Sequence, residues 1–425
     1  MNALRCLLTI GMLFMVLLFS SEGRAKTLCL KVPTDGFVDE LDPAVASNRV
    51  QFGTPFSGRR YMFARGVWVR VTNNQTGIVD FNNYLDANGC TTFNSSGEFP
   101  APSYSVRLYL KAQVATSGAP NYITVRRRNE PDTLGFYENI QLITTSLIGS
   151  GTATIYVTDE FILPRELVTL SYVMQDRFRG PLTGTYLEVH DWMAGDDYTP
   201  CIEEPPDSSA CKSGGKYRLQ LRRDAVADAS VRAYLITHEY GHAILRMNGD
   251  QAGKDNIGSV TYNHVARGSC TGGDGHSFSS IEWDSAAATE GWAHYVATDV
   301  WTSHTSSAPN DPAWMARYYS STPLNMEGAS TSYPVRLCIT NCGGCDIGAS
   351  NETDWARQLW DFHTNSTPGS YQDHSAMLEA VYGSFPWFTS NTNDSVRAFL
   401  TSSQLPRWDA LASNVNGNGI DEGNY

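Results

Sequence analysis

Two histidines and a glutamate lie within one short run, Leu235–Ile244 (LITHEYGHAI), and these residue types can bind and use a metal ion. On an α-helix, residues four apart share one face, with Cβ atoms about 5–6 Å apart, so His238 and His242 can reach the same ion. Imidazole nitrogens bind Zn²⁺ at about 2.0–2.1 Å. Glu239 would lie beside that ion, where a carboxylate can accept a proton from activated water. The run therefore predicts a zinc site with a general base.

The surrounding residues predict the helix that must hold both histidines. Asp228 or Ser230 can cap its start, and Asn248 followed by glycine can end it. Gly241 in the helix interior costs about 1 kcal/mol relative to alanine, so we expect another element packed closely against it. One stripe at helical spacing should face the core: Val231, Leu235, His238, His242 and Leu245.

A second stretch, Thr289–Ala297 (TEGWAHYVA), offers a third ligand in Glu290. The small residues Gly291 and Ala293 would let another backbone approach this helix. Catalytic zinc sites use three protein ligands and a water, and two histidines with one glutamate form a standard set. In another zinc-binding pattern, a glycine and a third histidine ligand follow the HExxH run three and six residues after its second histidine. This chain has Leu245 and Asn248 at those positions. Two inert histidines on a buried helix face are the remaining alternative.

HEYGH followed by EGWAHY resembles the zinc sites of the gluzincin metallopeptidases, which include the thermolysin family and the bacterial collagenases. The collagenases carry a similar Glu-Gly-x-Ala-x-Tyr run. The resemblance covers only two helices. It implies an α+β zincin-like catalytic domain in which His238, His242 and Glu290 bind Zn²⁺ and Glu239 is the general base.

The chain departs from that family in two ways. The interval from His242 to Glu290 is longer than in many members, which implies an inserted loop. His294 stands where the family often has an acidic residue that orients the zinc ligands. Asp284 and Asp299 are candidates for that orienting role.

Further residues are candidates for the reaction. His363 ends an amphipathic stretch, Asp354–His363 (DWARQLWDFH), which resembles the late helix packed behind the site in secreted HExxH proteins. Core packing is the first expected role of this stretch, and His363 is a candidate second catalytic residue. The loop Asn248–Ser280 is rich in glycine and polar residues and is expected to rim the cleft. Three of its residues could stabilise an oxyanion: Tyr262, His264 and His276.

Lys216–Arg222 (KYRLQLR) alternates as a strand and lies just before the histidine helix. An edge strand there could pair with an extended polypeptide substrate through main-chain hydrogen bonds. An ordinary sheet strand is the equal alternative.

The first 25 residues are typical of a secretory signal peptide. Arg5 supplies the positive end and Cys6–Phe19 the apolar core. This core is shorter than the roughly 20 residues that span a membrane, although an uncleaved anchor is the alternative. We expect a secreted, extracellular monomer without a membrane span after signal removal. The net charge of −13 argues against nucleic acid and anionic membranes as partners.

The 425 residues exceed one typical core, so we predict several segments. Alternating runs between turn signals in residues 26–158 predict a β-sandwich accessory domain, or alternatively a removable propeptide. Within it, the basic run 126–128 would be a solvated edge or a processing site. Residues 159–388 form the predicted zincin-like metallopeptidase domain, and residues 389–425 a polar C-terminal tail.

Removing Cys6 with the signal leaves eight cysteines, which favours disulfides in an exported protein. Cys29 with Cys90 and Cys201 with Cys211 are plausible pairs, while the other four stay open. Three of those four have the spacing of iron–sulfur enzymes, which an oxidising compartment opposes: Cys338, Cys342 and Cys345.

The polar run Asn414–Glu422 resembles a Ca²⁺ loop because oxygen-bearing side chains alternate along it, although a disordered tail is the alternative.

Together these features predict a secreted zinc-dependent peptidase that hydrolyses polypeptides. Two other classes stay open. One is a non-catalytic binding or adhesion protein whose zinc site is structural or degenerate; His294 as a fourth ligand would favour it. The other is a zinc hydrolase of non-peptide bonds, since the same Lewis-acid chemistry serves other substrates.

Overall fold

The computed structural model describes the chain in separate stretches: residues 25–33, 61–96, 103–114, 119–127, 140–144, 152–157, 162–174, 186–192, 209–213, 216–222, 229–251, 284–301, 352–364, 392–413 and 420. Residues 1–24 of the predicted signal peptide (1–25), the candidate oxyanion residues and the three cysteines with iron–sulfur spacing lie outside them. So does the possible Ca²⁺ run, apart from Ile420.

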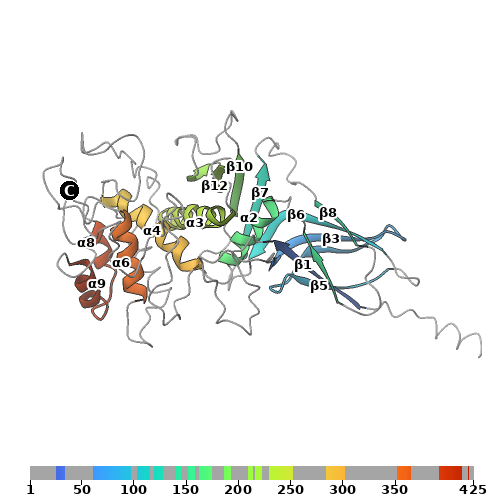
Figure 1. Ribbon diagram of the computed structural model, residues 1–425, viewed down its shortest axis with the longest axis horizontal. Coiled ribbons are helices and arrows are strands. Elements are labelled where there is room, and N and C mark those ends of the chain that lie inside the picture. The colour runs from blue at the N-terminus through green and yellow to red at the C-terminus, as the bar shows by residue number, and fades with distance from the viewer. Residues whose placement is uncertain are drawn as a thin grey trace, which may run out of the picture.

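Two sheets occupy one part of the molecule (Figure 1). The four-stranded sheet is built around β1 (Ala25–Pro33), which pairs antiparallel with β2 (Tyr61–Phe63) and β5 (Cys90–Asn94) and parallel with β9 (Thr152–Tyr156). The eight-stranded sheet has the order β11-β12-β10-β7-β6-β3-β4, with β8 also paired to β6. Its strands are β3 (Val67–Asn73), β4 (Val79–Tyr84), β6 (Tyr104–Val114), β7 (Asn121–Arg127), β8 (Ile140–Thr144), β10 (Tyr186–Trp192), β11 (Ser209–Ser213) and β12 (Lys216–Arg222).

One face of the eight-stranded sheet is apolar because every second side chain is a buried aliphatic, as in β3, where Val67, Val69 and Val71 are fully buried. The four-stranded sheet shares the core with this face; Phe93 of β5 packs edge-on against Tyr104 of β6, with ring centroids 5.7 Å apart. Further along the sheet, α2 (Ile162–Tyr172) packs on β6 and β7, and α3 (Ala229–Gln251) packs on β11 and β12.

The eight-stranded sheet runs across the predicted boundary at residue 158. β10 pairs in parallel with β7, and the register places Val189 beside Val125. Strands from the predicted accessory segment and from the predicted catalytic segment therefore share one sheet. The zincin-like and β-sandwich assignments remain predictions.

The predicted substrate strand has a different place from the one expected. β12 pairs with β10 on one side and with β11 on the other, so both of its edges are used within the sheet. Of the two equal alternatives for Lys216–Arg222, the edge strand was therefore wrong and the ordinary sheet strand is confirmed. In the described part of the chain, β11 is the strand that ends the sheet at this side.

The basic run at 126–128 begins inside the sheet. Arg126 lies on β7 and is only 4% exposed, and its Nη2 donates to Glu188 Oε1 at 2.6 Å. Arg218 Nε donates to the other oxygen of Glu188 at 3.1 Å. Arg126 is thus buried in an ion cluster, and the prediction of a solvated edge or processing site was wrong for this residue.

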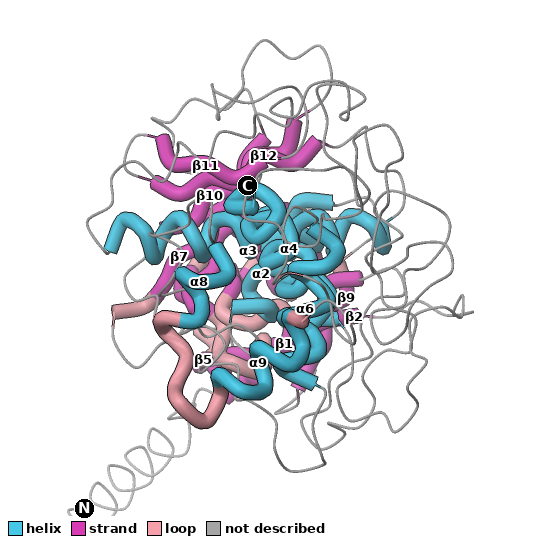
Figure 2. The backbone as a smooth tube through the Cα atoms, turned by 90° about the vertical axis from the view of Figure 1, so that its left-hand side faces the viewer, coloured by secondary structure: helices cyan, strands magenta, loops and turns pink. Residues whose placement is uncertain are grey.

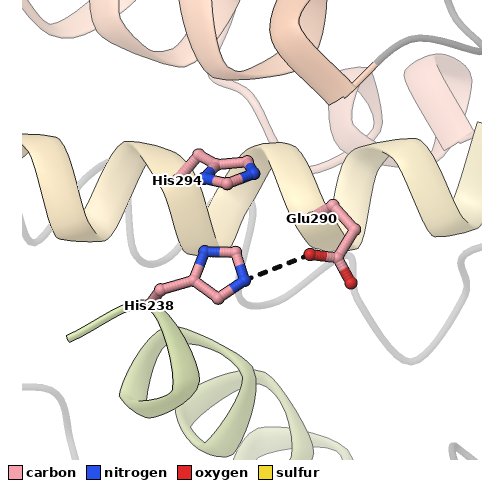
Figure 3. A group of neighbouring side chains, drawn as sticks. All are labelled: His238, Glu290 and His294. Carbon is pink, nitrogen blue, oxygen red and sulfur yellow. Dashed lines mark ion pairs between the residues drawn. The ribbon is translucent and has the colours of Figure 1, made fainter. Parts of the chain in front are cut away.

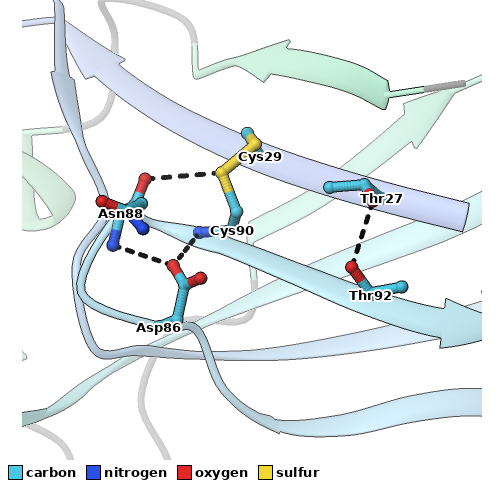
Figure 4. The surroundings of a disulfide bond; sticks show 6 residues. All are labelled: Thr27, Cys29, Asp86, Asn88, Cys90 and Thr92. Carbon is cyan, nitrogen blue, oxygen red and sulfur yellow. Dashed lines mark hydrogen bonds between the residues drawn. A yellow bond between two sulfur atoms is a disulfide. The ribbon is translucent and has the colours of Figure 1, made fainter.

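A disulfide joins β1 to β5, as Figure 4 shows. Cys29 and Cys90 are paired residues in the strand register, and the predicted bond between them is present. Asp86 Oδ1 accepts from the backbone N–H groups of Asn88 and Cys90, both at 2.8 Å, and so fixes the turn that leads into β5. Cys211 is also disulfide-bonded, whereas Cys201, its predicted partner, lies outside the described residues.

Four further helices of the described residues lie away from the two sheets (Figure 1): α4 (Asp284–Trp301), α6 (Glu352–Thr364), α8 (Thr392–Arg397) and α9 (Leu405–Ala412). α4 packs against both α3 and α6, and Figure 2 shows these three helices close together in the middle of the view. Among the described residues, no helix is long and apolar enough to cross a membrane.

The predicted polar tail contains packed structure. Trp408 of α9 is fully buried and meets Phe362 of α6 edge-on, with ring centroids 5.2 Å apart. Gln358 Nε2 of α6 donates to Trp408 O at 3.1 Å, and Trp408 Nε1 donates to Asn393 Oδ1 at 2.8 Å. α9 therefore packs on α6, and α8 is joined to α9 through Asn393 and also packs on α4.

Candidate metal centre

The centre is built where α3 and α4 approach at small residues. A Cβ added to Gly241 would lie 2.9 Å from Ala293 Cα and 3.4 Å from Val296 Cβ, so the missing side chain sets the distance between the helices. Trp292 Nε1 of α4 donates to Gly241 O of α3 at 3.1 Å. The close packing expected at Gly241 and Ala293 is confirmed.

This approach brings three side-chain donor atoms together. His238 Nε2 lies 3.1 Å from His242 Nε2, because the two residues are one turn apart on α3. Glu290 Oε2 of α4 lies 3.2 Å from His238 Nε2 and 3.3 Å from His242 Nε2. Figure 3 shows His238 on one helix pointing at Glu290 on the other.

The spacing of these atoms fits a small tetrahedral ion. Ligands at about 2.0–2.1 Å from a tetrahedral centre lie about 3.3–3.4 Å from one another. The three observed separations are 3.1, 3.2 and 3.3 Å, close to three edges of such a tetrahedron. Two imidazoles and a carboxylate also form a donor set that suits Zn²⁺. The residues present therefore fit a zinc ion.

Burial and neighbouring charges shift the pKa values of His238 and His242 in opposite directions. All three residues are buried, with His238 and Glu290 each 2% exposed and His242 7% exposed. Burial lowers the pKa of His238 to about 3, with a further lowering from His294, so this imidazole is neutral near neutral pH. Burial is the largest single influence on the pKa of His242 and lowers it, but the charge and hydrogen bond of Glu290 and the charge of Glu239 together outweigh burial, so the net shift is upward. A neutral imidazole has the lone pair that metal binding requires.

Glu239 lies beside the donor group. It follows His238 directly on α3 and is 3% exposed. It precedes His242 by three residues on the same helix, and its negative charge is one of the influences that raise the pKa of His242. The position agrees with the predicted base, whose role remains a prediction.

His294 is near the donors but is directed elsewhere. His238, Glu290 and His294 offer ligand atoms within 4.8 Å of one another, so His294 is a possible ligand by proximity. However, its Nδ1 is 2.9 Å from Tyr234 Oη, and its Nε2 is 3.6 Å from Glu352 Oε1. Because each nitrogen faces another partner, we favour His242 over His294 as the third donor.

His363 contacts a different face of α4. Its Nδ1 is 2.8 Å from Tyr295 Oη, and it is 5% exposed. Among the described contacts, none joins His363 to the three donor residues, and its predicted catalytic role remains untested. The side chains of Asp284 and Asp299, and the whole of Tyr262, His264 and His276, lie outside the described part.

Two residues beside the centre were not identified from the sequence. Tyr234 precedes His238 by one helical turn, so helical spacing alone could have placed it on the histidine face. Glu352 begins α6, far along the chain from His294, and no local pattern connects the two residues.

Comparison of the chain with protein-family models, curated proteins and solved structures finds no match in any of the three. The fold and the donor geometry are therefore the basis for the functional argument.

Proposed function

We propose that this protein is a zinc-dependent peptidase of the gluzincin type, exported from the cell, in which His238, His242 and Glu290 hold the metal. The observation that carries the proposal is the triangle of donor atoms with sides of 3.1, 3.2 and 3.3 Å, contributed by two helices. A zinc ion bound there supplies Lewis-acid chemistry, which activates water near neutral pH and polarises a carbonyl oxygen.

Glu239 is the group that moves the proton. A buried carboxylate next to the metal ligands can take a proton from the attacking water and pass it to the leaving amine. His238 and His242 accept no proton in this scheme, because their nitrogens hold the metal. Glu290 contributes the negative charge that two neutral imidazoles lack.

A catalytic role is favoured over a purely structural one by the direction of His294. A structural zinc site uses four protein ligands, whereas a catalytic site keeps one position for water. Both His294 nitrogens face Tyr234 and Glu352, so this residue does not complete a four-ligand set in the described part of the chain.

Polypeptide substrate can be bound at the end of the eight-stranded sheet. β11 is the last described strand beside β12, and α3, which carries the histidines, packs on both. An extended peptide pairing with β11 would run beside the metal-binding helix and use main-chain hydrogen bonds. Peptides with N-methylated backbones should then bind more weakly than the unmodified peptides.

The test is Glu239→Gln, with metal content and hydrolysis of a denatured protein measured on the same preparation. We expect one zinc per chain in the wild type and in the variant. Hydrolysis should fall by about 10²–10⁴-fold, as for loss of a general base. Glu166→Gln is the matched control, because Glu166 is also a buried helical glutamate, 1% exposed, but belongs to α2.

Full activity of Glu239→Gln would refute the role of this residue. A wild-type protein that binds zinc but cleaves no peptide bond would favour a binding protein, and activity on esters alone would favour a hydrolase of non-peptide bonds.

A further inference from the structure

The first metal-binding histidine belongs to a cluster of three rings. Tyr234 and His238 of α3 are stacked, with ring centroids 6.4 Å apart, and Tyr234 and His294 are stacked at 6.1 Å. The rings of His238 and His294 are closest, with centroids at 4.4 Å. Figure 3 shows the His294 ring above the His238 ring, with both His294 and Glu290 on α4. His294 therefore limits where the His238 ring can lie.

His294 is itself held from two other helices. Tyr234 of α3 contacts its Nδ1 at 2.9 Å, and Glu352 of α6 faces its Nε2 at 3.6 Å. His294 and Glu352 are fully buried, and Tyr234 is 2% exposed. In so dry a place, the carboxylate and the hydroxyl can fix the orientation of the imidazole more strongly than they would in water.

The backbone around these residues is equally constrained. A Cβ added to Gly291 would lie 2.8 Å from Glu352 O, so α6 begins directly against α4. The same helix start therefore presents both its carbonyl group and the Glu352 side chain to α4. This contact fixes the position of Glu352 along the axis of α4, and therefore its position relative to His294.

We propose that His294 is a positioning residue for the metal centre, oriented by Tyr234 and Glu352, and that it fixes the His238 ring against the ion. The proposal rests on the proposed function only in requiring that the metal binds at His238, His242 and Glu290. The carboxylate behind this imidazole belongs to Glu352 of α6, whose Oε1 lies 3.6 Å from His294 Nε2. Groups behind a metal ligand commonly tune its affinity by about 10–100-fold.

The experiment measures zinc affinity by competition with a chromophoric chelator, and the visible spectrum of the Co²⁺-substituted protein. His294→Phe keeps a ring but removes both nitrogens, and it should weaken zinc binding by about 10–100-fold while one zinc per chain is retained. Tyr234→Phe and Glu352→Gln should weaken it less. Each should shift the Co²⁺ spectrum, which reports ligand geometry.

Tyr234→Phe removes a single hydroxyl, so it keeps the test valid if the ring replacement does not fold. His294→Asn retains an amide near the position of Nδ1 and should recover part of the affinity. Thr298→Val is the matched control: Thr298 is fully buried on α4, one turn beyond His294, and this change should leave both readouts unaltered.

Unchanged affinity and an unchanged Co²⁺ spectrum in the three weakening variants would overturn the proposal, because His294 would then serve packing alone. Complete loss of the metal in His294→Phe, as in His238→Ala, would also overturn it, because His294 would then be a ligand. A wild-type protein that binds no zinc refutes both proposals. A wild type that binds zinc without hydrolysis refutes only the proposed function, since the affinities still decide the role of His294.

Discussion

In the four-stranded sheet, β1 is held against β5 by backbone pairing and by the Cys29–Cys90 disulfide, whereas in the candidate metal centre α3 meets α4 at Gly241 and Ala293. The contact between the strands is made by repeated main-chain hydrogen bonds, which form with many different side chains at the same positions. The helix contact depends on the absence of one side chain. Stability should therefore depend strongly on the covalent link in the first region, and metal affinity on the small residues in the second.

Removing the disulfide should have the largest effect on stability. Cys29 and Cys90 are 61 residues apart, and closing a loop of this length stabilises the folded state by about 4 kcal/mol in the chain-entropy model. The variant Cys29→Ala/Cys90→Ala should lose about that much free energy of unfolding in urea denaturation. Its zinc affinity, measured where the protein is still folded, should equal that of the wild type. A large loss of affinity would show that the two regions are coupled.

The substitution Gly241→Ala should lower zinc affinity as well as stability, unlike removal of the disulfide. The new Cβ would meet Ala293 Cα at 2.9 Å, so α3 and α4 must separate, and the overlap costs about 1–3 kcal/mol, partly offset by the better helix propensity of alanine. Glu290 then moves away from His238 and His242, and zinc affinity should fall.

Gly77→Ala is the matched control in the sheet region. Gly77 has φ +70° and nothing within 4 Å of an added Cβ, so only backbone strain of about 1–2 kcal/mol applies. It should reduce stability without changing zinc affinity. Equal zinc affinities in Gly241→Ala and Gly77→Ala would contradict a metal centre set by the helix contact.

The smallest expected effect concerns acid sensitivity at His190, next to Glu188, Arg126 and Arg218. Burial lowers its pKa below the ordinary value, and Glu188 only partly opposes this. Both the folded and unfolded states are neutral at His190 above about pH 6.5, and below it the unfolded state gains the proton first. His190 therefore makes the protein less stable as the pH falls from about 6.5 towards the folded pKa, by at most about 1.4 kcal/mol per pH unit.

The variant His190→Gln should lose this part of the pH dependence. Urea denaturation between about pH 7 and pH 5 measures it, as the difference between the wild type and the variant. Parallel curves for the two proteins would show that His190 takes up its proton equally in both states.

Local periodicity predicted much of the candidate site. The spacing of His238 and His242 placed two donors on one helix face, and the small residues Gly241 and Ala293 indicated where a second helix approaches. What it could not supply was the network behind His294, because Glu352 comes from a helix far along the chain. Side-chain alternation identifies which face of an element is buried but not which distant residue fills the space beside it.

The same limit explains the errors in the fold. Alternation in Lys216–Arg222 correctly indicated a strand, but a strand at the edge and one inside a sheet can have the same pattern, and β12 is inside. The tail was predicted as polar because of its average composition. Average composition does not show that a single residue of this segment, Trp408, is buried and packs its ring against α6.

The parallel pairing of β7 with β10 bears on how such a chain could mature. Here, cleavage that released residues 26–158 would withdraw β7 from between β10 and β6, and the strands beyond it would go as well. The three strands left in this sheet, β10, β11 and β12, would then have β10 as an unpaired edge strand, which can pair with another chain and aggregate. If residues 26–158 were cleaved from the rest of the chain, we therefore expect the amino-terminal strands to stay paired with β10.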